Sequence, residues 1–257
     1  MKKSAIGFVG GGRITKIFLH GFQNKQVELK SVTVCENNEE KRNSLKTEFP
    51  SVVTTDSIAD LRGADVVFIA LHPPVIGENL LKLRDIIGNN TIIVSLAPKF
   101  NIQKLAELAG TNRIVRMIPN ASSIVNLGYN PICFSEGIDS SEKASILELL
   151  GDLGNTFETE ERKLEAYAIA SAMLPTYFWF QWNEMEKISQ EMGLTARESR
   201  ETVYETLKSS LELLYHSGLN YSEVIDLIPV KPIGEDEAQI KEILNGKLLA
   251  LFDKIKP

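Results

Sequence analysis

Short apolar runs alternate with amphipathic segments along the first part of the chain. The run at residues 66–71 carries no charge and is rich in β-branched residues, which is typical of a parallel strand covered on both faces. The amphipathic segments have the spacing of helices that pack one side against a sheet. This alternation predicts right-handed βαβ units in a doubly wound parallel sheet. Strands are predicted at residues 5–9, 29–35, 52–53, 66–71, 91–96, 113–116, 132–134 and 156–158, and helices at residues 38–49, 75–87, 102–109 and 142–153.

After about residue 160 only helical periodicity is found. Helices are predicted at residues 163–192, 196–216, 221–227 and 237–255. The first of them should be interrupted or kinked near Pro175, because proline removes a backbone donor and clashes with the preceding turn. Thr195 and Glu198 have the capping-box pattern that begins a helix. We therefore expect an α/β domain over residues 1–160 and an all-α domain over residues 161–257.

A glycine turn separates the first predicted strand from the helix that follows it. Gly10, Gly11 and Gly12 directly follow the apolar run at residues 5–9. Gly10 permits a tight turn, and Gly12 lets the backbone approach a pyrophosphate on the first N–H groups of the helix. The stretch predicts a dinucleotide-binding unit, so the N-terminal sheet is expected to be Rossmann-like.

Two further positions bear on this interpretation. Glu36 directly follows the second predicted strand, 24 residues past Gly12. This is near the roughly 20-residue spacing at which a carboxylate binds an adenosine ribose. Such a carboxylate repels a 2′-phosphate and favours NADH over NADPH, although Arg13 and the Lys41–Arg42 pair weaken that preference. Thr15 stands where the fingerprint has glycine or alanine, and adds bulk between helix and strand. A glycine-rich turn without a dinucleotide is the alternative.

The composition is that of an ordinary globular protein with an acidic excess. The chain has 257 residues, 43% hydrophobic and 24% charged, and a formal net charge of −6. Bulk electrostatics therefore argue against a nucleic-acid partner. No run reaches the roughly 18 apolar residues of a membrane span, and the N-terminal apolar run is too short for a signal peptide. We expect no membrane partner and a cytoplasmic location.

Cysteine and histidine are sparse. Cys35 and Cys133 lack CxxC spacing and are predicted to be reduced thiols. The three histidines are scattered, and no cluster of histidine, cysteine and carboxylate has ligand spacing. No metal site is predicted.

Aromatic residues cluster on the first helix of the C-terminal domain, and these are Tyr177, Phe178, Trp179, Phe180 and Trp182. They cover more than one face of the helix, and a small domain cannot bury all of them. No basic residues are interleaved with them, which disfavours a stacking platform for nucleic acid. The band predicts core packing together with a homodimer or higher homo-oligomer formed through the helical domain, and part of it is expected to line a ligand pocket.

Six motifs along the chain form a set: IGFVGGG at 6–12, ADVVFIALHP at 64–73, IIVS at 92–95, RMIPN at 116–120, SAMLPTY at 171–177 and GLTA at 193–196. Together they resemble pyrroline-5-carboxylate reductase, a two-domain enzyme of proline biosynthesis that uses a nicotinamide cofactor to reduce a cyclic imine to proline. The resemblance covers essentially the whole length. It implies cofactor contacts at Gly10, Gly12, Arg13, Ile14, Leu71, His72 and Pro73, with Asn120 near the nicotinamide; the glycine turn adds Gly11, and the ribose position adds Glu36. One departure is His72, which stands where the family usually has lysine.

The substrate side departs further from the family. The family reads Ser-Gly-Ser-Gly-Pro-Ala-Tyr at residues 171–177, and only a remnant of its Ser-Pro-Gly-Gly-Thr-Thr motif is present at residues 231–236. Ala172 and Leu174 would crowd the approach of backbone amides to a substrate carboxylate. Glu235 or Asp236 replaces the threonine that bonds the substrate amine. The predicted substrate-binding residues are Asn120, Ser171, Met173, Pro175, Tyr177 and Glu235, and Glu235 is the single candidate for a catalytic role.

These features predict an NAD(P)H-dependent oxidoreductase that transfers a hydride to the C=N bond of a small cyclic imino acid or related metabolite. A protonated imine is already electrophilic, so its reduction requires no dedicated side-chain acid, whereas a ketone needs a donor for the developing alkoxide. Two alternatives stay open. The chain could be a nucleotide-binding sensor or partner subunit that has lost catalysis, or a relative of the deazaflavin-dependent NADP oxidoreductases.

Overall fold

The computed structural model describes residues 4–257, which divide into two compact units. Unit 1 comprises Met1–Ala172 with Phe252–Pro257, and unit 2 comprises Met173–Leu251. The first unit therefore extends beyond the boundary predicted at residue 160, and it includes the end of the chain.

Unit 1 contains an eight-stranded sheet with the strand order β3-β2-β1-β4-β5-β6-β7-β8. Strands β1 to β6 run parallel, as predicted, but β7 is antiparallel to β6. The connection between β6 and β7 is too short for a parallel crossover, so the chain reverses direction there. The strands are β1 (Ala5–Val9), β2 (Ser31–Cys35), β3 (Val53–Thr55), β4 (Val66–Ile69), β5 (Ile92–Ser95), β6 (Ile114–Met117), β7 (Gly128–Phe134) and β8 (Gly154–Glu158).

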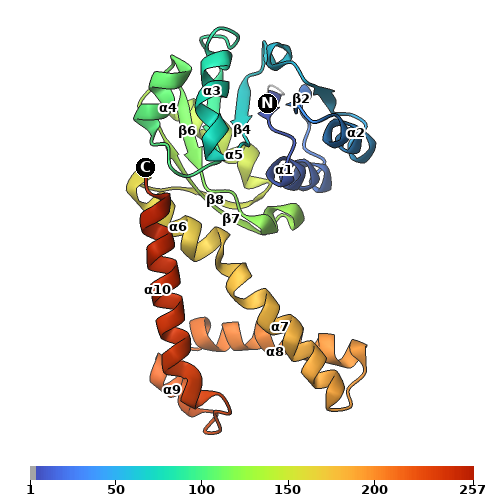
Figure 1. Cartoon of the computed structure of the whole chain (residues 1–257), viewed down its shortest axis with the longest axis vertical. Coiled ribbons are helices and arrows are strands. Elements are labelled where there is room, and N and C mark those ends of the chain that lie inside the picture. The colour runs from blue at the N-terminus through green and yellow to red at the C-terminus, as the bar shows by residue number, and fades with distance from the viewer. Residues whose placement is uncertain (1–3) are drawn as a thin grey trace. The chain divides into compact units, whose positions relative to one another are not determined.

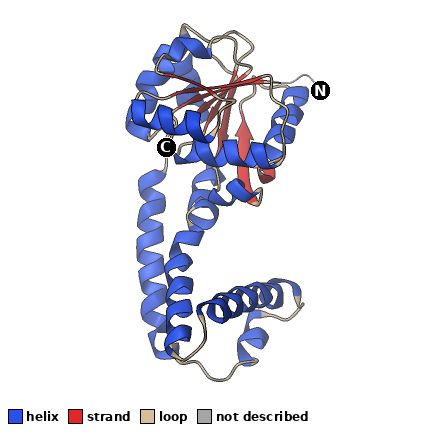
Figure 2. Ribbon diagram, turned by 90° about the vertical axis from the view of Figure 1, so that its right-hand side faces the viewer, coloured by secondary structure: helices blue, strands red, loops and turns tan. Residues whose placement is uncertain are grey.

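Helices cover both faces of this sheet, as Figures 1 and 2 show. One hydrophobic cluster joins the sheet to α1 (Arg13–Asn24), α2 (Glu39–Glu48) and α5 (Ser140–Gly151). A second cluster joins the other face to the 3-10 helix η1 (Ile58–Leu61), α3 (Pro73–Arg84) and α4 (Ile102–Ala109). The predicted Rossmann-like, doubly wound N-terminal fold is confirmed.

The segment after the sheet contains three short helical pieces instead of the start of one long helix. These are the 3-10 helix η3 (Glu161–Lys163), α6 (Leu164–Tyr167) and a π-helical turn over Ala168–Ala172. Helix α7 (Leu174–Glu191) follows, with Pro175 in its first turn. Proline is tolerated there because the first N–H groups of a helix have no intrahelical partner. The predicted interruption near Pro175 is thus a change of helix type.

Unit 2 consists only of helices and loops. It contains α7, α8 (Ala196–His216), α9 (Tyr221–Asp226), the 3-10 helix η5 (Gly234–Asp236) and most of α10 (Glu237–Ile255). Ser199 is the one buried residue between Met173 and Leu251, and no residue of α7 is buried. The predicted core role of the aromatic band is therefore wrong for the single chain. In the part of the chain that the structure describes, no helix has the length and apolar character needed to cross a membrane.

Candidate functional site

The glycine turn has a geometry that side chains would disrupt. Gly10 has a φ of 100°, and a Cβ placed on it would lie 2.6 Å from the carbonyl oxygen of Ala70. The turn is anchored to the neighbouring strand by a 2.8 Å hydrogen bond from the N–H of Gly10 to the carbonyl of Cys35. Gly10 is thus required by both its backbone conformation and the close approach of β4.

Gly12 instead faces open space. A Cβ on Gly12 would meet nothing within 4 Å. Gly12 is the N-cap of α1, no side chain caps that end, and the first turn, which includes Arg13 and Ile14, has no acidic residue. The first N–H groups of α1 are therefore open to an anion, with the positive end of the helix dipole behind them. This cradle fits the pyrophosphate of a dinucleotide.

Thr15 is accommodated through a hydrogen bond. Its side chain is fully buried, and its hydroxyl donates to the carbonyl of Gly10 at 2.6 Å. The side chain that was expected to add bulk between helix and strand therefore forms a hydrogen bond to the backbone of the glycine turn.

Glu36 is joined directly to the glycine turn. One carboxylate oxygen accepts from the N–H of Gly11 at 2.9 Å, and the other accepts from the N–H of Asn38 at 2.9 Å. Arg42 is committed elsewhere, because its guanidinium donates to the carbonyls of Glu36 and Asn37. It also lies 3.4 Å from a carboxylate oxygen of Asp56. The carboxylate thus lies beside the cradle, at the end of β2.

The carboxyl ends of β4, β5 and β6 lie along the same edge of the sheet. Ile69 of β4 pairs with Ser95 of β5, which in turn pairs with Arg116 of β6. Ligands of doubly wound sheets bind at this edge. Leu71 and His72 follow β4, and Pro73 begins α3. His72 is exposed at the N-cap of α3, and its side chain makes no capping hydrogen bond.

Asn120 lies just beyond β6 and is held by hydrogen bonds of its backbone and of its side chain. Its backbone N–H donates to Oδ1 of Asn130, and its own Oδ1 accepts from the N–H of Ser122. Its Nδ2 donates to the hydroxyl of Ser171 at 3.3 Å. Ser171 in turn donates to the carbonyl of Tyr129 at 3.1 Å. The structure therefore brings together two of the predicted site residues, Asn120 and Ser171, which lie 51 positions apart in the sequence.

The remaining predicted substrate residues lie in unit 2. Met173 and Pro175 flank the start of α7, and Tyr177 lies in its first turns. Burial raises the pKa of the Tyr177 phenol above its ordinary value. Glu235 is exposed in η5, on a different element. Roles for these four residues remain predictions.

The cysteine thiols are poorly suited to nucleophilic or metal chemistry. Burial raises the pKa of Cys35, and it raises the pKa of Cys133 to about 12. Both thiols are buried and unpaired. Among the residues that the structure describes, no group of three histidine, cysteine or carboxylate side chains is placed to hold a metal ion.

Two residues to which the sequence analysis gave no role are distinctive in the structure. Arg116 is fully buried in β6 and paired with Glu161 and Glu165. Lys99, in the loop after β5, has a φ of 77° although it is not glycine. An arginine in an otherwise apolar strand was the available signal for the first, and nothing in the sequence marks the backbone of the second.

The family described as NADP oxidoreductase coenzyme F420-dependent matches residues 5–99. Over longer stretches, the chain is 22% identical over 253 residues to a pyrroline-5-carboxylate reductase of Corynebacterium melassecola, covering 97% of this chain and 93% of the relative. It is 27% identical over 221 residues to the enzyme of the same name from Aquifex aeolicus, covering 86% and 82%.

A solved structure has a similar fold. The pyrroline carboxylate reductase of Plasmodium falciparum, determined with NADP bound, superposes with a TM-score of 0.85 at 21% identity, covering 100% of this chain and 98% of that one. The predicted resemblance to the pyrroline-5-carboxylate reductases is confirmed. The matches also support the predicted class of enzyme, an NAD(P)-dependent reductase.

Proposed function

We propose that this chain reduces the C=N bond of a small cyclic imino acid or a related metabolite with a hydride from a nicotinamide dinucleotide. The observation that carries the proposal is the uncapped N-terminus of α1 behind Gly12, joined through Gly11 to the carboxylate of Glu36. The full-length similarity to pyrroline-5-carboxylate reductases supports the choice of reaction. A place in proline or other amino-acid metabolism follows from that similarity.

The residues of unit 1 have distinct roles in this proposal. The open amides of α1 bind the pyrophosphate, and Glu36 accepts from the ribose hydroxyls. A bound nicotinamide supplies the hydride that adds to the imine carbon, while the nitrogen keeps its proton and becomes an amine. Asn120 and Ser171 lie at the edge of the sheet where the nicotinamide would end, and they orient the ring and the substrate. Because the protonated imine is already electrophilic, the main requirement is alignment.

The function is tested by following NADH or NADPH oxidation with pyrroline-5-carboxylate and a panel of cyclic imines. We expect turnover of at least one carboxylated imine. Inactivity with every imine, in a preparation that binds the cofactor, refutes the proposal. That outcome would favour a nucleotide-binding sensor or partner subunit.

We also propose that NADH is preferred over NADPH, because Glu36 stands beside the glycine turn and would repel a 2′-phosphate. The ratio of kcat/KM for the two cofactors should favour NADH, and Glu36→Ala should remove most of that preference. Glu40→Ala is the matched control, since Glu40 is an exposed carboxylate in the first turn of α2. A wild-type preference for NADPH contradicts this assignment while leaving the reaction class intact.

The matched family named for coenzyme F420 covers only the N-terminal part of the chain. A deazaflavin-dependent activity is therefore the less supported reading, because the pyrroline-5-carboxylate reductases match across unit 2 as well. It predicts hydride transfer from NADPH to an oxidised deazaflavin, or from a reduced deazaflavin to NADP+, which an absorbance assay detects.

We further propose a homodimer or higher homo-oligomer assembled through unit 2. The support is the large apolar surface that this unit exposes in the single chain, including Phe180, Tyr215 and Met192, which are 66%, 71% and 78% exposed. Monomeric proteins rarely leave contiguous apolar surface of this kind in water.

A further inference from the structure

Arg116 is the largest fully buried side chain of the protein as the structure describes it, and it carries a charge. Its Nη1 donates to Glu161 at 2.8 Å, and its Nη2 donates to Glu165 at 2.5 Å. Glu165 is itself only 3% exposed. A buried charge is tolerated only with such partners, because an unpaired ion in the interior is costly. The pair is therefore a fixed connection between β6 and the segment at residues 161–172.

Glu161 extends this connection to a third element. The same carboxylate oxygen that accepts from Arg116 also accepts from the N–H of Ile102, at the start of α4, at 2.6 Å. Strand β6, helix α4 and the segment 161–172 thus meet at one guanidinium. Unit 1 continues past the last strand to Ala172, and the contacts of Glu161 and Glu165 are among those that join this segment to the sheet.

A second connection joins the same two segments further along. Asn120 lies four residues after Arg116, and Ser171 lies six residues after Glu165. The hydrogen bond from Asn120 to Ser171 therefore joins the same two segments as the ion pair of Arg116 with Glu165, but closer to the edge of the sheet. The π-helical turn at Ala168–Ala172 begins after Glu165 and contains Ser171. Such turns insert a residue and redirect the side chains that follow, often at functional sites.

We propose that Arg116 is a positioning residue: through Glu161 and Glu165 it sets the register of residues 161–172 against β6, so that Ser171 is presented at Asn120. This inference rests on the proposed function, in which Ser171 contacts the substrate. Arg116 itself does not touch the reacting groups. Loosening its ion pair allows the π-helical turn to shift, and Ser171 leaves its place without any change at the glycine turn.

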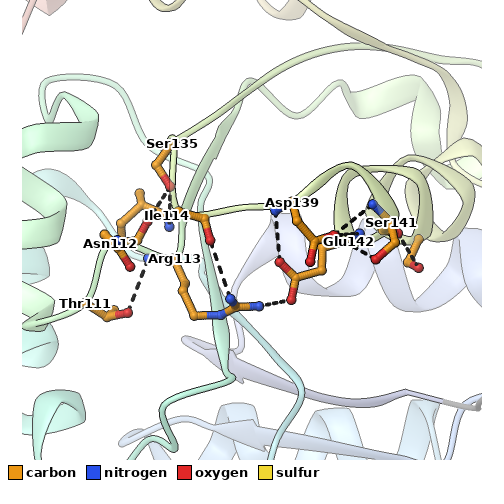
Figure 3. A network of polar contacts seen from close by, with 10 residues as sticks. Thr111, Asn112, Arg113, Ile114, Ser135, Asp139, Ser141 and Glu142 are labelled. Carbon is orange, nitrogen blue, oxygen red and sulfur yellow. Dashed lines mark hydrogen bonds and ion pairs between the residues drawn. The ribbon is translucent and has the colours of Figure 1, made fainter.

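A matched control lies at the other end of the same strand. Arg113 immediately precedes β6 and pairs with Glu142 of α5, as Figure 3 shows. Its guanidinium also donates to the carbonyl of Gly137. The pair joins β6 to a neighbouring helix in the same way, but at the amino end of the strand. Removing it loosens unit 1 without reaching Asn120 or Ser171.

The test compares Arg116→Met/Glu165→Met with Arg113→Met/Glu142→Met in the full-length protein. Replacing Arg116 and Glu165 together leaves no fully buried charge without a partner, because the remaining carboxylate of Glu161 is 34% exposed and keeps its hydrogen bond from the N–H of Ile102. We expect the first variant to lose about tenfold or more in kcat/KM for the imine, with cofactor affinity within about twofold of wild type. The second variant should keep both values. Arg116→Lys retains the charge and should therefore lose less kcat/KM than the double variant. It replaces the double variant in this comparison if the double variant does not fold.

A double-mutant cycle with Ser171→Ala separates positioning from general stability. If Arg116 acts through Ser171, the Arg116/Glu165 change should cost less than about twofold in kcat/KM when Ser171 is already alanine. A full, additive loss in that background overturns the inference, because Arg116 would then act independently of Ser171.

Hydrogen exchange gives a readout that does not depend on turnover. The amides of residues 168–172 should lose about tenfold or more in protection in the Arg116/Glu165 variant and keep it in the Arg113/Glu142 variant. Equal protection in the two variants overturns the inference. If no imine is reduced by the wild type, the proposed function fails, and the exchange data alone still decide whether Arg116 holds this segment.

Discussion

The hydroxyl of Thr15 allows a residue larger than glycine or alanine at this position after the glycine turn. Thr15 is completely buried and donates to the carbonyl of Gly10 at 2.6 Å. Thr15→Val keeps the shape but removes the donor, leaving the Gly10 carbonyl short of a partner, which costs about 1–3 kcal/mol. We expect lower stability to urea and weaker cofactor binding. Thr15→Ser keeps the donor and should retain most cofactor affinity. A valine variant that matches wild type in both measurements contradicts this role.

Lys99 carries a side chain although its backbone adopts a conformation that favours glycine. Its φ of 77° lies in the left-handed region, which costs a residue with a Cβ roughly 1–2 kcal/mol, while glycine adopts it freely. Lys99→Gly should therefore raise the free energy of unfolding by roughly 0.5–1 kcal/mol after the greater flexibility of unfolded glycine is subtracted. Lys99→Ala keeps the strain and is the control. Urea unfolding checks both variants, and equal effects of glycine and alanine would rule out backbone strain at this position.

At the scale of elements, the capping box of α5 links stability to pH. The Asp139 carboxylate accepts from the backbone N–H groups of Ser141 and Glu142 and from the Ser141 hydroxyl. In turn, the Glu142 carboxylate accepts from the backbone N–H of Asp139 (Figure 3). These hydrogen bonds, led by that of the Ser141 hydroxyl, lower the pKa of Asp139 below its ordinary value of 3.8. Because the pKa of Asp139 is lower in the folded protein, its charged carboxylate contributes fully to stability above pH 3.8. This contribution to stability is lost as the pH falls through the pKa of the folded state.

The measurement is the urea midpoint of wild type and Asp139→Asn between pH 2 and pH 7. The wild type should lose more stability on acidification than the variant, because asparagine cannot be protonated in that range and still accepts from the helix amides. Glu148→Gln, an exposed change on the same helix, is the control. Parallel pH profiles for wild type and Asp139→Asn would contradict the contribution of the cap.

The elements show which parts of the fold follow from local pattern. Strands β1, β4 and β5 were predictable because burial on both faces demands a continuous apolar run. The start of β7 at Gly128 was missed, since Gly128, Asn130 and Pro131 lack strand propensity and are held by pairing with β8. The pairing with β8 determines where β7 begins, and such tertiary pairing cannot be recognised in a single sequence.

The residues of the candidate site also differ in whether local sequence pattern could predict them. The glycine turn and Glu36 could be found from their spacing, because the cofactor imposes the spacing on the chain. The contact of Asn120 with Ser171, and that of Arg116 with Glu165, join residues about 50 positions apart. No periodicity links such positions, so the family resemblance supplied Asn120 and Ser171 as site residues. Arg116 entered only as the first residue of the RMIPN motif, without a role, and Glu165 was not named.

At the scale of the whole molecule, the two units differ in how they bury apolar surface. Unit 1 has hydrophobic clusters on both faces of its sheet. Unit 2 buries only Ser199 among residues 173–251, and its large apolar side chains stay in contact with water. A group of helices without a core gains little from folding alone, since tertiary packing supplies most helical stability. Association with a second copy would supply that packing.

We therefore expect a homo-oligomer in sedimentation and light-scattering measurements at micromolar concentration. Phe180→Glu and Tyr215→Glu place charges on exposed apolar positions of α7 and α8, and each should shift the protein toward monomer with loss of helical circular dichroism from unit 2. Val53→Glu is the matched control, since Val53 is 57% exposed at the edge of the unit 1 sheet. If the wild type is monomeric and still fully helical, unit 2 must be stable without a partner. The assembly proposal then fails, while the cofactor site of unit 1 stands unaffected.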